Sequence, residues 1–334
     1  MERISHRFHL LLLISLMVYG GVGASLLRAQ DVPEPQYRLT QDQTHNRFSS
    51  AIPPVLRVPS GAVIEAYTKE ASDGQLTLES TIDDVANLDF DPIHPLTGPV
   101  YVEGAEPGDI LAVTLHRIEL GDYGWTAVIP GFGFLADEFE EPYLKTFAFE
   151  EGQAVVRFGE GIMLPLRPFP GVIGVAPATE EMLSTVPPRA NGGNLDDPNI
   201  VEGSTVYLPV FVEGALFSIG DAHAIQGMGE VCGTAIEAPM RFVYELNVIK
   251  GRTIQEPQYE TDDYYAVTGF GESIDEAAKK ATKYMIDYLV DVRGLRRVDA
   301  YALASLAADL KIAEVVDVPH MLVTMHIPKS IFED

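Results

Sequence analysis

Short stretches with alternating or continuous apolar residues recur between residues 31 and 260, and proline and glycine separate them. An alternation with a period of two is typical of half-buried strands, and Pro and Gly between such stretches favour turns. The clearest strand–turn–strand pattern consists of residues 55–58, the turn Pro59-Ser60-Gly61 and residues 62–67. We predict further strands at residues 100–102, 110–118, 155–158, 172–176, 204–212, 214–219 and 241–249.

The pattern changes behind residue 268. Ser273, followed by Glu276 at the third helical position, is typical of a helix start with a capping box. Apolar residues then recur at spacings of three and four, which predicts an amphipathic helix from residue 274 to about 292, ended by Gly294. A second helix is expected at residues 298 to about 310, and strands at 314–318 and 321–327.

These elements predict a mainly β fold with a smaller α/β C-terminal portion. We expect a β-rich, sandwich- or barrel-like catalytic body at residues 31–250. The α/β portion at residues 251–334 is expected to pack on that body.

Residues 1–29 have the pattern of a signal peptide. Arg3 and Arg7 precede an apolar run that extends from residue 10 to about 27, and small residues at 20–24 close it. Cleavage after Ala29 is favoured over cleavage after Ala24. An uncleaved anchor is the alternative, but about 17 apolar residues is short for a membrane span. We therefore expect export to the periplasm or the exterior, with no stable membrane span after cleavage.

The charge and the composition limit the kinds of partner that the protein can bind and the ways in which its fold can be stabilised. The 334-residue chain has a net charge of −26, which disfavours nucleic acid as a partner. Its 46% of hydrophobic residues suffice for one large or two modest cores. Cys232 is the only cysteine, so packing or a metal, and not an intrachain disulfide, must hold the fold together.

The segment Asp221-Ala222-His223, with Glu230 soon after it, is the densest group of candidate site residues. If the strand at residues 214–219 continues, Asp221 and His223 lie on one face and can bind a metal together. Glycines at positions 220, 227 and 229 let the backbone approach a ligand closely. The alternative is an Asp that only orients a core His.

Three other segments place polar groups on turns. Residues 191–199, which include Asn194 and Asp196, combine oxygen donors with two adjacent glycines, although an exposed loop is the simpler interpretation. His45 lies on a loop before a strand, and His94 lies between two prolines that stiffen the backbone. The remaining histidines in apolar runs are expected to be structural: His116, His320 and His326.

Taken in order, these segments resemble the acetamidase/formamidase family. The likeness extends from residue 45 to 329 and is carried by HNRFSSAIPPVLRVPSG (45–61), HPLTGPVYVEGAEPGD (94–109), GGNLD (192–196), GSTVYLPVFVEGALFSIGDAHAIQGMGEVCGTAIE (203–237) and IPKSIF (327–332). The resemblance implies hydrolysis of short amides to a carboxylate and ammonia. It also implies a β-rich fold with a smaller α/β part and favours a homodimer or higher homo-oligomer.

The resemblance further implies a divalent metal, with zinc preferred over calcium or another ion. We expect Asp221 and His223 to bind it, with His45 and Asp196 as further ligands. The substrate is expected to meet a set of neighbouring residues: Gln226, Gly227, Asn194 and His94.

The expected mechanism uses the metal to activate water and polarise the carbonyl group. Glu230 is expected to carry the proton to the leaving amine, with Glu237 as the reserve acid. Backbone amides near Gly227 and Gly229 are expected to assist the oxyanion. A covalent route is less favoured, because no G-x-S-x-G motif is present and a structural role suits Cys232 better than a nucleophilic one.

Met228 departs from the family pattern, which usually has an acid at this position. The change can alter the charge at a metal site or favour apolar substrates, or it can be silent. The signal peptide is a second departure, since the well-known members are cytoplasmic. Two alternatives remain: an exported, non-catalytic β-rich ligand-binding protein of the same fold, and a hydrolase of a different amide such as a lactam.

Overall fold

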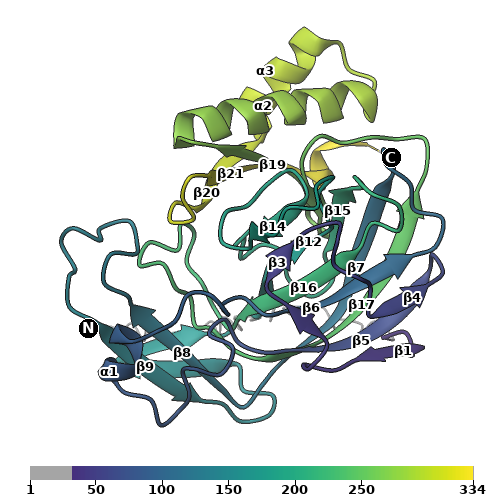
Figure 1. Cartoon of the computed structure of the whole chain (residues 1–334). Helices are drawn as coiled ribbons and strands as arrows, with labels where there is room; N and C mark the ends of the chain where they lie inside the picture. Colours follow the sequence, from purple (N-terminus) through teal and green to yellow (C-terminus); the bar gives the residue numbers. More distant parts are fainter. Residues whose placement is uncertain (1–31, 334) are drawn as a thin grey trace, which may run out of the picture. The chain divides into compact units, whose positions relative to one another are not determined.

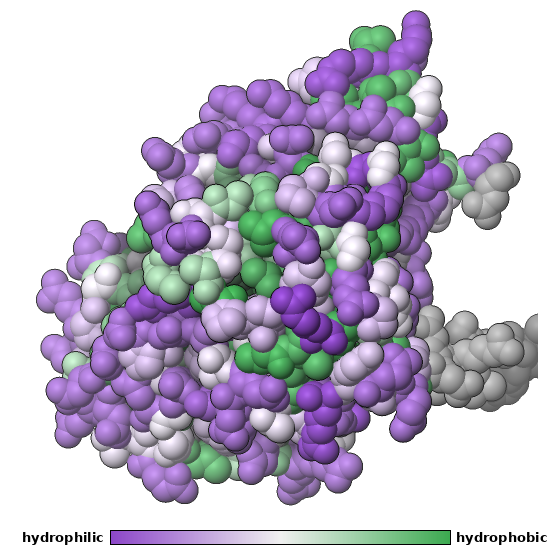
Figure 2. Space-filling model, turned by 45° about the vertical axis from the view of Figure 1, so that its right-hand side comes forward, coloured by the Kyte–Doolittle hydropathy of each residue, from purple (hydrophilic) through white to green (hydrophobic). Residues whose placement is uncertain are grey.

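The computed structural model describes residues 32–333, and strands predominate in them over helices (Figure 1). The predicted signal peptide at residues 1–29 lies outside the described residues. Among the residues described, no helix has both the length and the apolar character needed to span a membrane. Hydrophilic side chains cover most of the face drawn in Figure 2, with hydrophobic side chains in patches between them, as the high net charge leads one to expect.

A nine-stranded sheet runs through the body and the C-terminal portion, and all of its pairs are antiparallel except β1 with β5. Its strands, in spatial order, are β1 (Tyr37–Leu39), β5 (Ala62–Thr68), β17 (Met240–Ile249), β7 (Ile110–Leu120), β15 (Thr205–Pro209), β18 (Gln258–Glu260), β19 (Tyr264–Gly271), β21 (Met321–Pro328) and β20 (Asp309–Glu314). Because β15 pairs with β18, the predicted C-terminal portion continues the sheet of the body.

A six-stranded sheet lies against this first one. It contains β14 (Gly192–Asn194), β12 (Phe169–Gly174), β16 (Phe217–His223), β6 (Leu96–Val102) and β2 (Thr44–His45), with β4 (Leu56–Val58) also paired to β6. One buried apolar cluster contains side chains from both sheets, and Phe217 meets Tyr244 edge-on at 5.2 Å between ring centres. The mainly β prediction is confirmed, as two open sheets that form a sandwich.

Smaller elements lie outside these two sheets. Their bounds are β3 (Arg47–Phe48) paired with β13 (Leu183–Ser184), β8 (Tyr123–Val128) paired with β9 (Tyr143–Ala148), β10 (Val155–Gly159) paired with β11 (Ile162–Pro165), and the short α1 (Ile82–Ala86). A separate apolar cluster that includes Leu76, Val85 and Trp125 holds α1 and β8 together.

Two helices, α2 (Ile274–Asp291) and α3 (Arg297–Ala307), cover the C-terminal strands (Figure 1). The predicted cap is confirmed, because the Ser273 hydroxyl accepts a 3.2 Å hydrogen bond from the Glu276 amide. The predicted face of α2 is buried against β19 and β21, with Ala277, Ala281 and Met285 in contact with the sheet core. A short 3₁₀ helix, η1 (Lys329–Ile331), follows β21.

The boundary after α3 differs from the prediction. The helix ends at Ala307 rather than near residue 310, and the strand expected at 314–318 is instead β20 at Asp309–Glu314. Leu310 extends the apolar pattern of the helix, but its backbone pairs with Met325 of β21, so sheet pairing overrides the local pattern. Residues 315–318 thereby become a loop, and this loop has a role in the site.

Candidate active site

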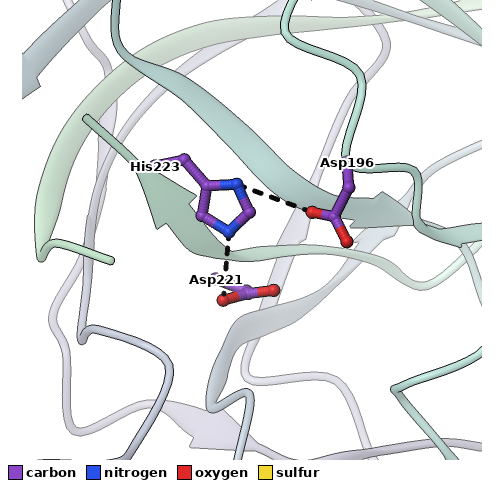
Figure 3. A group of neighbouring side chains, drawn as sticks. All are labelled: Asp196, Asp221 and His223. Atoms are coloured by element: carbon purple, nitrogen blue, oxygen red, sulfur yellow. Dashed lines mark ion pairs between the residues drawn. The ribbon is translucent and has the colours of Figure 1, made fainter. Parts of the chain in front are cut away.

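Strand β16 places Asp221 and His223 on the same face, as expected if the strand continued past residue 219. Asp221 Oδ1 lies 3.6 Å from Nε2 of His223. Asp196, in the loop after β14, brings its Oδ1 to 3.6 Å from Nδ1 on the other side of the ring (Figure 3). All three side chains are buried, so two carboxylates flank one imidazole away from bulk water.

Further buried carboxylates border this group. Oε2 of Glu237 lies 3.0 Å from Nε2 of His223. Among residues 32–333, three overlapping sets of side chains have potential ligand atoms within 4.8 Å of one another: Asp196, Asp221 and His223; His223, Glu230 and Glu237; and Asp196, Glu230 and Asp317. We call these six residues the acidic cluster.

Burial and mutual repulsion shift the pKa values of the acidic cluster. Burial, with neighbouring acids adding to it, raises the pKa of Glu237 to about 8 and those of Glu230 and Asp317 well above their usual range. Burial by itself lowers the pKa of His223, but Glu237 and Asp221 outweigh it, and the net pKa is raised well above 6.5. So many buried acids require protons or a cation to compensate their charge.

Gln226 fixes the orientation of the histidine. Its Nε2 donates to the backbone oxygen of Asp196 at 2.7 Å, so its Oε1 faces Nδ1 of His223 at 2.8 Å. An amide oxygen only accepts, so Nδ1 carries the proton. A metal bound in place of the Nε2 proton would therefore meet the Nε2 lone pair of a ring whose Nδ1–H is already held, which is the tautomer that a metal ligand needs.

The acidic cluster is packed tightly against β12. A Cβ added at Gly171 would lie 2.5 Å from Oδ1 of Asp196, 2.6 Å from the Asp221 backbone oxygen and 2.8 Å from Cε1 of His223. A glycine at this position therefore makes the space in which the three side chains converge.

Several residues of the site have strained backbone conformations. Four of the seven non-glycine residues with positive φ in residues 32–333 belong to the site: His94 (52°), Asp196 (39°), Asp221 (43°) and Glu230 (45°). Such conformations are unfavourable for residues with a Cβ and persist only where the surrounding structure imposes them. The fold thus holds these side chains in positions that their local sequence does not prefer.

The donor set fits a divalent cation. Within the described part of the chain, Oδ1 of Asp196, Oδ1 of Asp221 and Oδ1 of Asn194 are buried without a hydrogen-bond partner. Unpaired buried oxygens are costly, and a cation would satisfy the two carboxylate oxygens. Carboxylates beside a neutral imidazole suit zinc or another borderline divalent ion.

A small cavity opens above the acidic cluster. Carboxylates and His223 form its polar floor. Its walls are apolar and come from segments far apart in the sequence: Leu88, Phe90, Ile93, Trp125, Ile129, Phe132 and Val186. The arrangement can hold a small molecule whose polar group contacts the floor.

The expected substrate residues separate into two groups. Asn194 and His94 line the cavity; Nδ2 of Asn194 donates to Asp317 at 2.7 Å, and Nε2 of His94 lies 3.7 Å from Asp221. Gln226 and Gly227 do not line it. The Gly229 amide, expected near the oxyanion, donates instead to the Ala313 carbonyl at 2.7 Å.

Two further residues singled out from the sequence, His45 and Met228, do not line the cavity. The structure does not bring His45 into the acidic cluster, because its Nδ1 contacts the Arg47 carbonyl and its Nε2 the Ser218 hydroxyl, both at 2.7 Å. Met228 is 39% exposed, and its Sδ accepts a hydrogen bond from the Asn199 amide outside the cavity wall. Its side chain therefore does not face the space above the cluster.

The sequence pattern did not indicate Asp317 as a site residue. The apolar pattern of residues 314–318 predicted a strand, which would have directed alternate side chains to opposite faces. In the structure, Glu314 Oε2 accepts the amides of Val316 and Asp317 at 3.0 Å each and forms a tight turn. An acid two residues before a proline is a weak turn signal, and it is the only one that the sequence offers here.

The comparisons agree with this fold. The sequence profile of the Acetamidase/Formamidase family matches residues 33–184 and 178–334. The chain is 28% identical to the formamidase of Methylophilus methylotrophus over 368 residues, which cover 87% of this chain and 90% of that one.

Two solved structures are also similar. An acetamidase of Bacillus halodurans has a TM-score of 0.83 and 34% identity, over 88% of this chain and 98% of that one. A gamma lactamase of Delftia acidovorans has a TM-score of 0.62 and 28% identity, over 88% and 90%. The chain therefore belongs to the Acetamidase/Formamidase family and is a hydrolase of non-peptide amide C–N bonds.

Proposed function

We propose that this protein is an exported, metal-dependent amidohydrolase that converts short linear amides, of which formamide and acetamide are the simplest, to a carboxylate and ammonia. The observation that supports it best is the acidic cluster around His223, buried beneath a cavity of substrate size. Relatives named acetamidase and formamidase support the substrate class. The proposal of export rests on the sequence pattern of residues 1–29 alone.

Asp196, Asp221 and His223 would hold the metal, because their ligand atoms converge and the Oδ1 atoms of both aspartates have no hydrogen-bond partner within residues 32–333. A divalent metal supplies Lewis acidity, which polarises the amide carbonyl and lowers the pKa of the attacking water. Gln226 would keep Nε2 of His223 free to bind by accepting the Nδ1 proton.

Glu230 is the best placed proton carrier. Its carboxyl group borders the cavity, and no residue among 32–333 hydrogen-bonds it. Glu237 also borders the cavity, but its Oε1 accepts the Ala235 amide at 2.8 Å and its Oε2 lies 3.0 Å from His223. Glu230 is thus free to hand a proton to the leaving nitrogen, while Glu237 orients the histidine.

Asn194 and His94 would position the amide. Both line the cavity beside Asp221, and Oδ1 of Asn194 has no hydrogen-bond partner within the described chain. That oxygen can accept a hydrogen bond from the NH₂ group of a primary amide. The apolar walls above would exclude water from the reacting groups.

Removal and return of the metal tests the proposal. Purified protein treated with a chelator should lose ammonia release from formamide and acetamide, and zinc or manganese should restore it. Metal content is measured by elemental analysis in parallel. If no divalent metal is bound and no amide yields ammonia under any of these conditions, the protein is the non-catalytic binding protein instead.

Hydrolysis of a γ-lactam is the second candidate, because the gamma lactamase of Delftia acidovorans shares the fold at a TM-score of 0.62. The same assay, with a γ-lactam added to the amides and the ring-opened amino acid measured by chromatography, separates the two. Faster turnover of the lactam than of every linear amide would favour this second function.

A further inference from the structure

The loop that carries Asp196 is also held from its other side, by buried side chains of the C-terminal strands. We propose that Tyr259 and His326 are positioning residues of the active site, which hold Asp196 in place through its neighbour Asp197. This role rests on the proposed function, in which Asp196 is a metal ligand. It gives the C-terminal portion of the chain a part in the chemistry, although neither Tyr259 nor His326 lines the cavity.

Asp196 and Asp197 are adjacent in the loop after β14, but their carboxylates have different partners. Oδ1 of Asp196 lies 3.6 Å from Nδ1 of His223, within the acidic cluster. Oδ2 of the fully buried Asp197 accepts the Tyr259 hydroxyl at 2.5 Å. Oδ1 of Asp197 accepts the backbone and side-chain amides of Asn199 at 3.0 and 2.6 Å. Because both of its oxygens are paired, the Asp197 carboxylate anchors the loop.

The anchor matters because the backbone of Asp196 is strained. Its φ of 39° is one that a residue with a Cβ keeps only where the surrounding structure imposes it. On the side of the site, the Asp196 carbonyl accepts the Gln226 amide at 2.7 Å, and the Asp196 amide donates to the Gly171 carbonyl at 3.2 Å. The hydrogen bond from Tyr259 to Asp197 holds the next residue on the other side. Without it the loop can relax and withdraw the Asp196 carboxylate from the imidazole.

The register of three strands brings Tyr259 and His326 together. Tyr259 on β18 pairs with Ala266 on β19, and Ala266 pairs with His326 on β21. All three residues are buried, and the small side chain of Ala266 lets the two rings meet across it. The ring centres are 5.6 Å apart at 88°, and Nε2 of His326 lies 2.9 Å from the Tyr259 hydroxyl. The sheet that continues from the body thus carries this pair to the loop.

The hydrogen bonds of the network run in one direction. The Lys311 ammonium group only donates, so Nδ1 of His326, 3.2 Å away, accepts. Burial lowers the pKa of His326 to about 4, so the neutral ring has its proton on Nε2, which faces the hydroxyls of Tyr259 and Thr324 at 2.9 Å each. Burial raises the pKa of Tyr259 well above 10, so its hydroxyl keeps the proton that it donates to Asp197.

Tyr259→Phe tests this role, because it removes the hydroxyl and keeps the buried ring. Titration of the purified protein with zinc against a chromogenic chelator should show an affinity about tenfold lower than in the wild type. Tyr265→Phe is the matched control and should leave the affinity unchanged. Tyr265 is also buried, and its hydroxyl donates to Gln258 at the same 2.5 Å, but its ring stacks on Tyr288 of α2, on the opposite face of the sheet.

Cobalt(II) provides a spectroscopic signature of the ligand arrangement. At saturating cobalt, the visible absorption of Tyr259→Phe should differ from that of the wild type, since Asp196 no longer keeps its place at the ion. Tyr265→Phe should give the wild-type spectrum. A loss of stability alone would not change the spectrum of the saturated protein. Wild-type zinc affinity and cobalt spectrum in Tyr259→Phe would overturn the positioning role and leave the metal site intact.

Two replacements of His326 separate hydrogen bonding from packing. In His326→Gln the side chain still has a donor for Tyr259 and an acceptor for Lys311, whereas in His326→Leu it has neither. Zinc affinity should stay within about threefold of the wild type in His326→Gln and fall about tenfold in His326→Leu. Equal losses in both variants would mean that His326 acts by packing alone and would remove it from the positioning role.

Hydrogen exchange in the metal-free protein separates this role from the proposed function. Mass spectrometry of peptides that span residues 191–203 should show faster exchange in Tyr259→Phe than in the wild type or in Tyr265→Phe, because the loop has lost an anchor. If the wild type binds no divalent metal, the proposed function fails, and exchange then decides the role of Tyr259. Faster exchange in Tyr259→Phe alone supports that role, and equal exchange in the two variants overturns it.

Discussion

The side-chain oxygen of Gln226 accepts a 2.8 Å hydrogen bond from Nδ1 of His223, while its side-chain nitrogen donates to the backbone oxygen of Asp196 at 2.7 Å. One glutamine thereby sets both the tautomer of the imidazole and the position of the loop that carries a carboxylate. Such partners orient metal ligands without touching the metal. The sequence predicted Gln226 as a substrate-binding residue, whereas in the structure its side chain contacts His223 and Asp196.

Replacing Gln226 by Leu should therefore weaken metal binding by about 10- to 100-fold, because the Nδ1 proton loses its acceptor and the ring is free to take the other tautomer. Titration with zinc in competition with a chromogenic chelator measures the affinity. Gln255→Leu is the matched control, since Gln255 is exposed and remote from the site. Unchanged affinity in the Gln226 variant would show that the hydrogen bond does not orient the histidine.

Gly171→Ala should abolish metal binding in a protein that still folds. The new methyl group would overlap Asp196 and the Asp221 backbone and drive the ligands apart. Gly159→Ala is the control, because a Cβ at Gly159, also in a strand, meets no atom within 4 Å. Elemental analysis after dialysis and circular dichroism measure the two properties. A fully metal-loaded Gly171 variant would refute the assignment of the site.

Glu230→Gln should lower kcat for acetamide by about 100-fold or more, because the amide cannot carry the proton to the leaving nitrogen. Metal content should stay at the wild-type level. Glu237→Gln is the comparison: it replaces a carboxylate 3.0 Å from Nε2 of His223 and should alter metal affinity as well as rate. Wild-type turnover in Glu230→Gln would remove Glu230 from the proton-transfer role.

His45 should make the fold sensitive to acid. Burial lowers its pKa from 6.5 to about 4. Because this folded-state pKa lies below the unfolded-state value, the unfolded chain binds more protons in between. The stability that neutral His45 contributes is fully present above pH 6.5 and is lost as the pH falls towards 4.

The loss amounts to about 2 kcal/mol between roughly pH 7 and pH 5. His45→Asn, which does not titrate, should be less stable than the wild type at neutral pH but should lose less stability over this range. Urea unfolding of both proteins at several pH values measures the difference. Parallel pH profiles for the two proteins would show that His45 does not titrate on unfolding.

Much of the fold was predictable because its signals are local. Strands such as β5 and β16 are short runs of mostly buried residues, and α2 has its cap and its apolar face within one stretch of sequence. The end of α3 was not predictable, because Leu310 continues the apolar pattern of the helix while the pairing of β20 with β21 comes from residues further along the chain.

The site was predictable only in part, for a similar reason. Asp221 and His223 are two residues apart on one strand, so their pairing follows from strand geometry. Asp317 joins the cluster through a turn that Glu314 forms by accepting two amides, and this depends on tertiary structure. His45 begins the first of the strings that resemble the family. Its strand, β2, pairs with β6, and there other groups contact both of its ring nitrogens.

The positive φ angles of His94, Asp196, Asp221 and Glu230 also bear on how this protein can change over time. Each such conformation costs on the order of 1 kcal/mol, so each position would gain stability from glycine or, less so, asparagine. Laboratory evolution for heat resistance alone would therefore tend to accept these replacements and lose the enzyme. Selection for activity and for robustness act in opposite directions at these four residues, and a stabilised variant that works must gain its stability elsewhere.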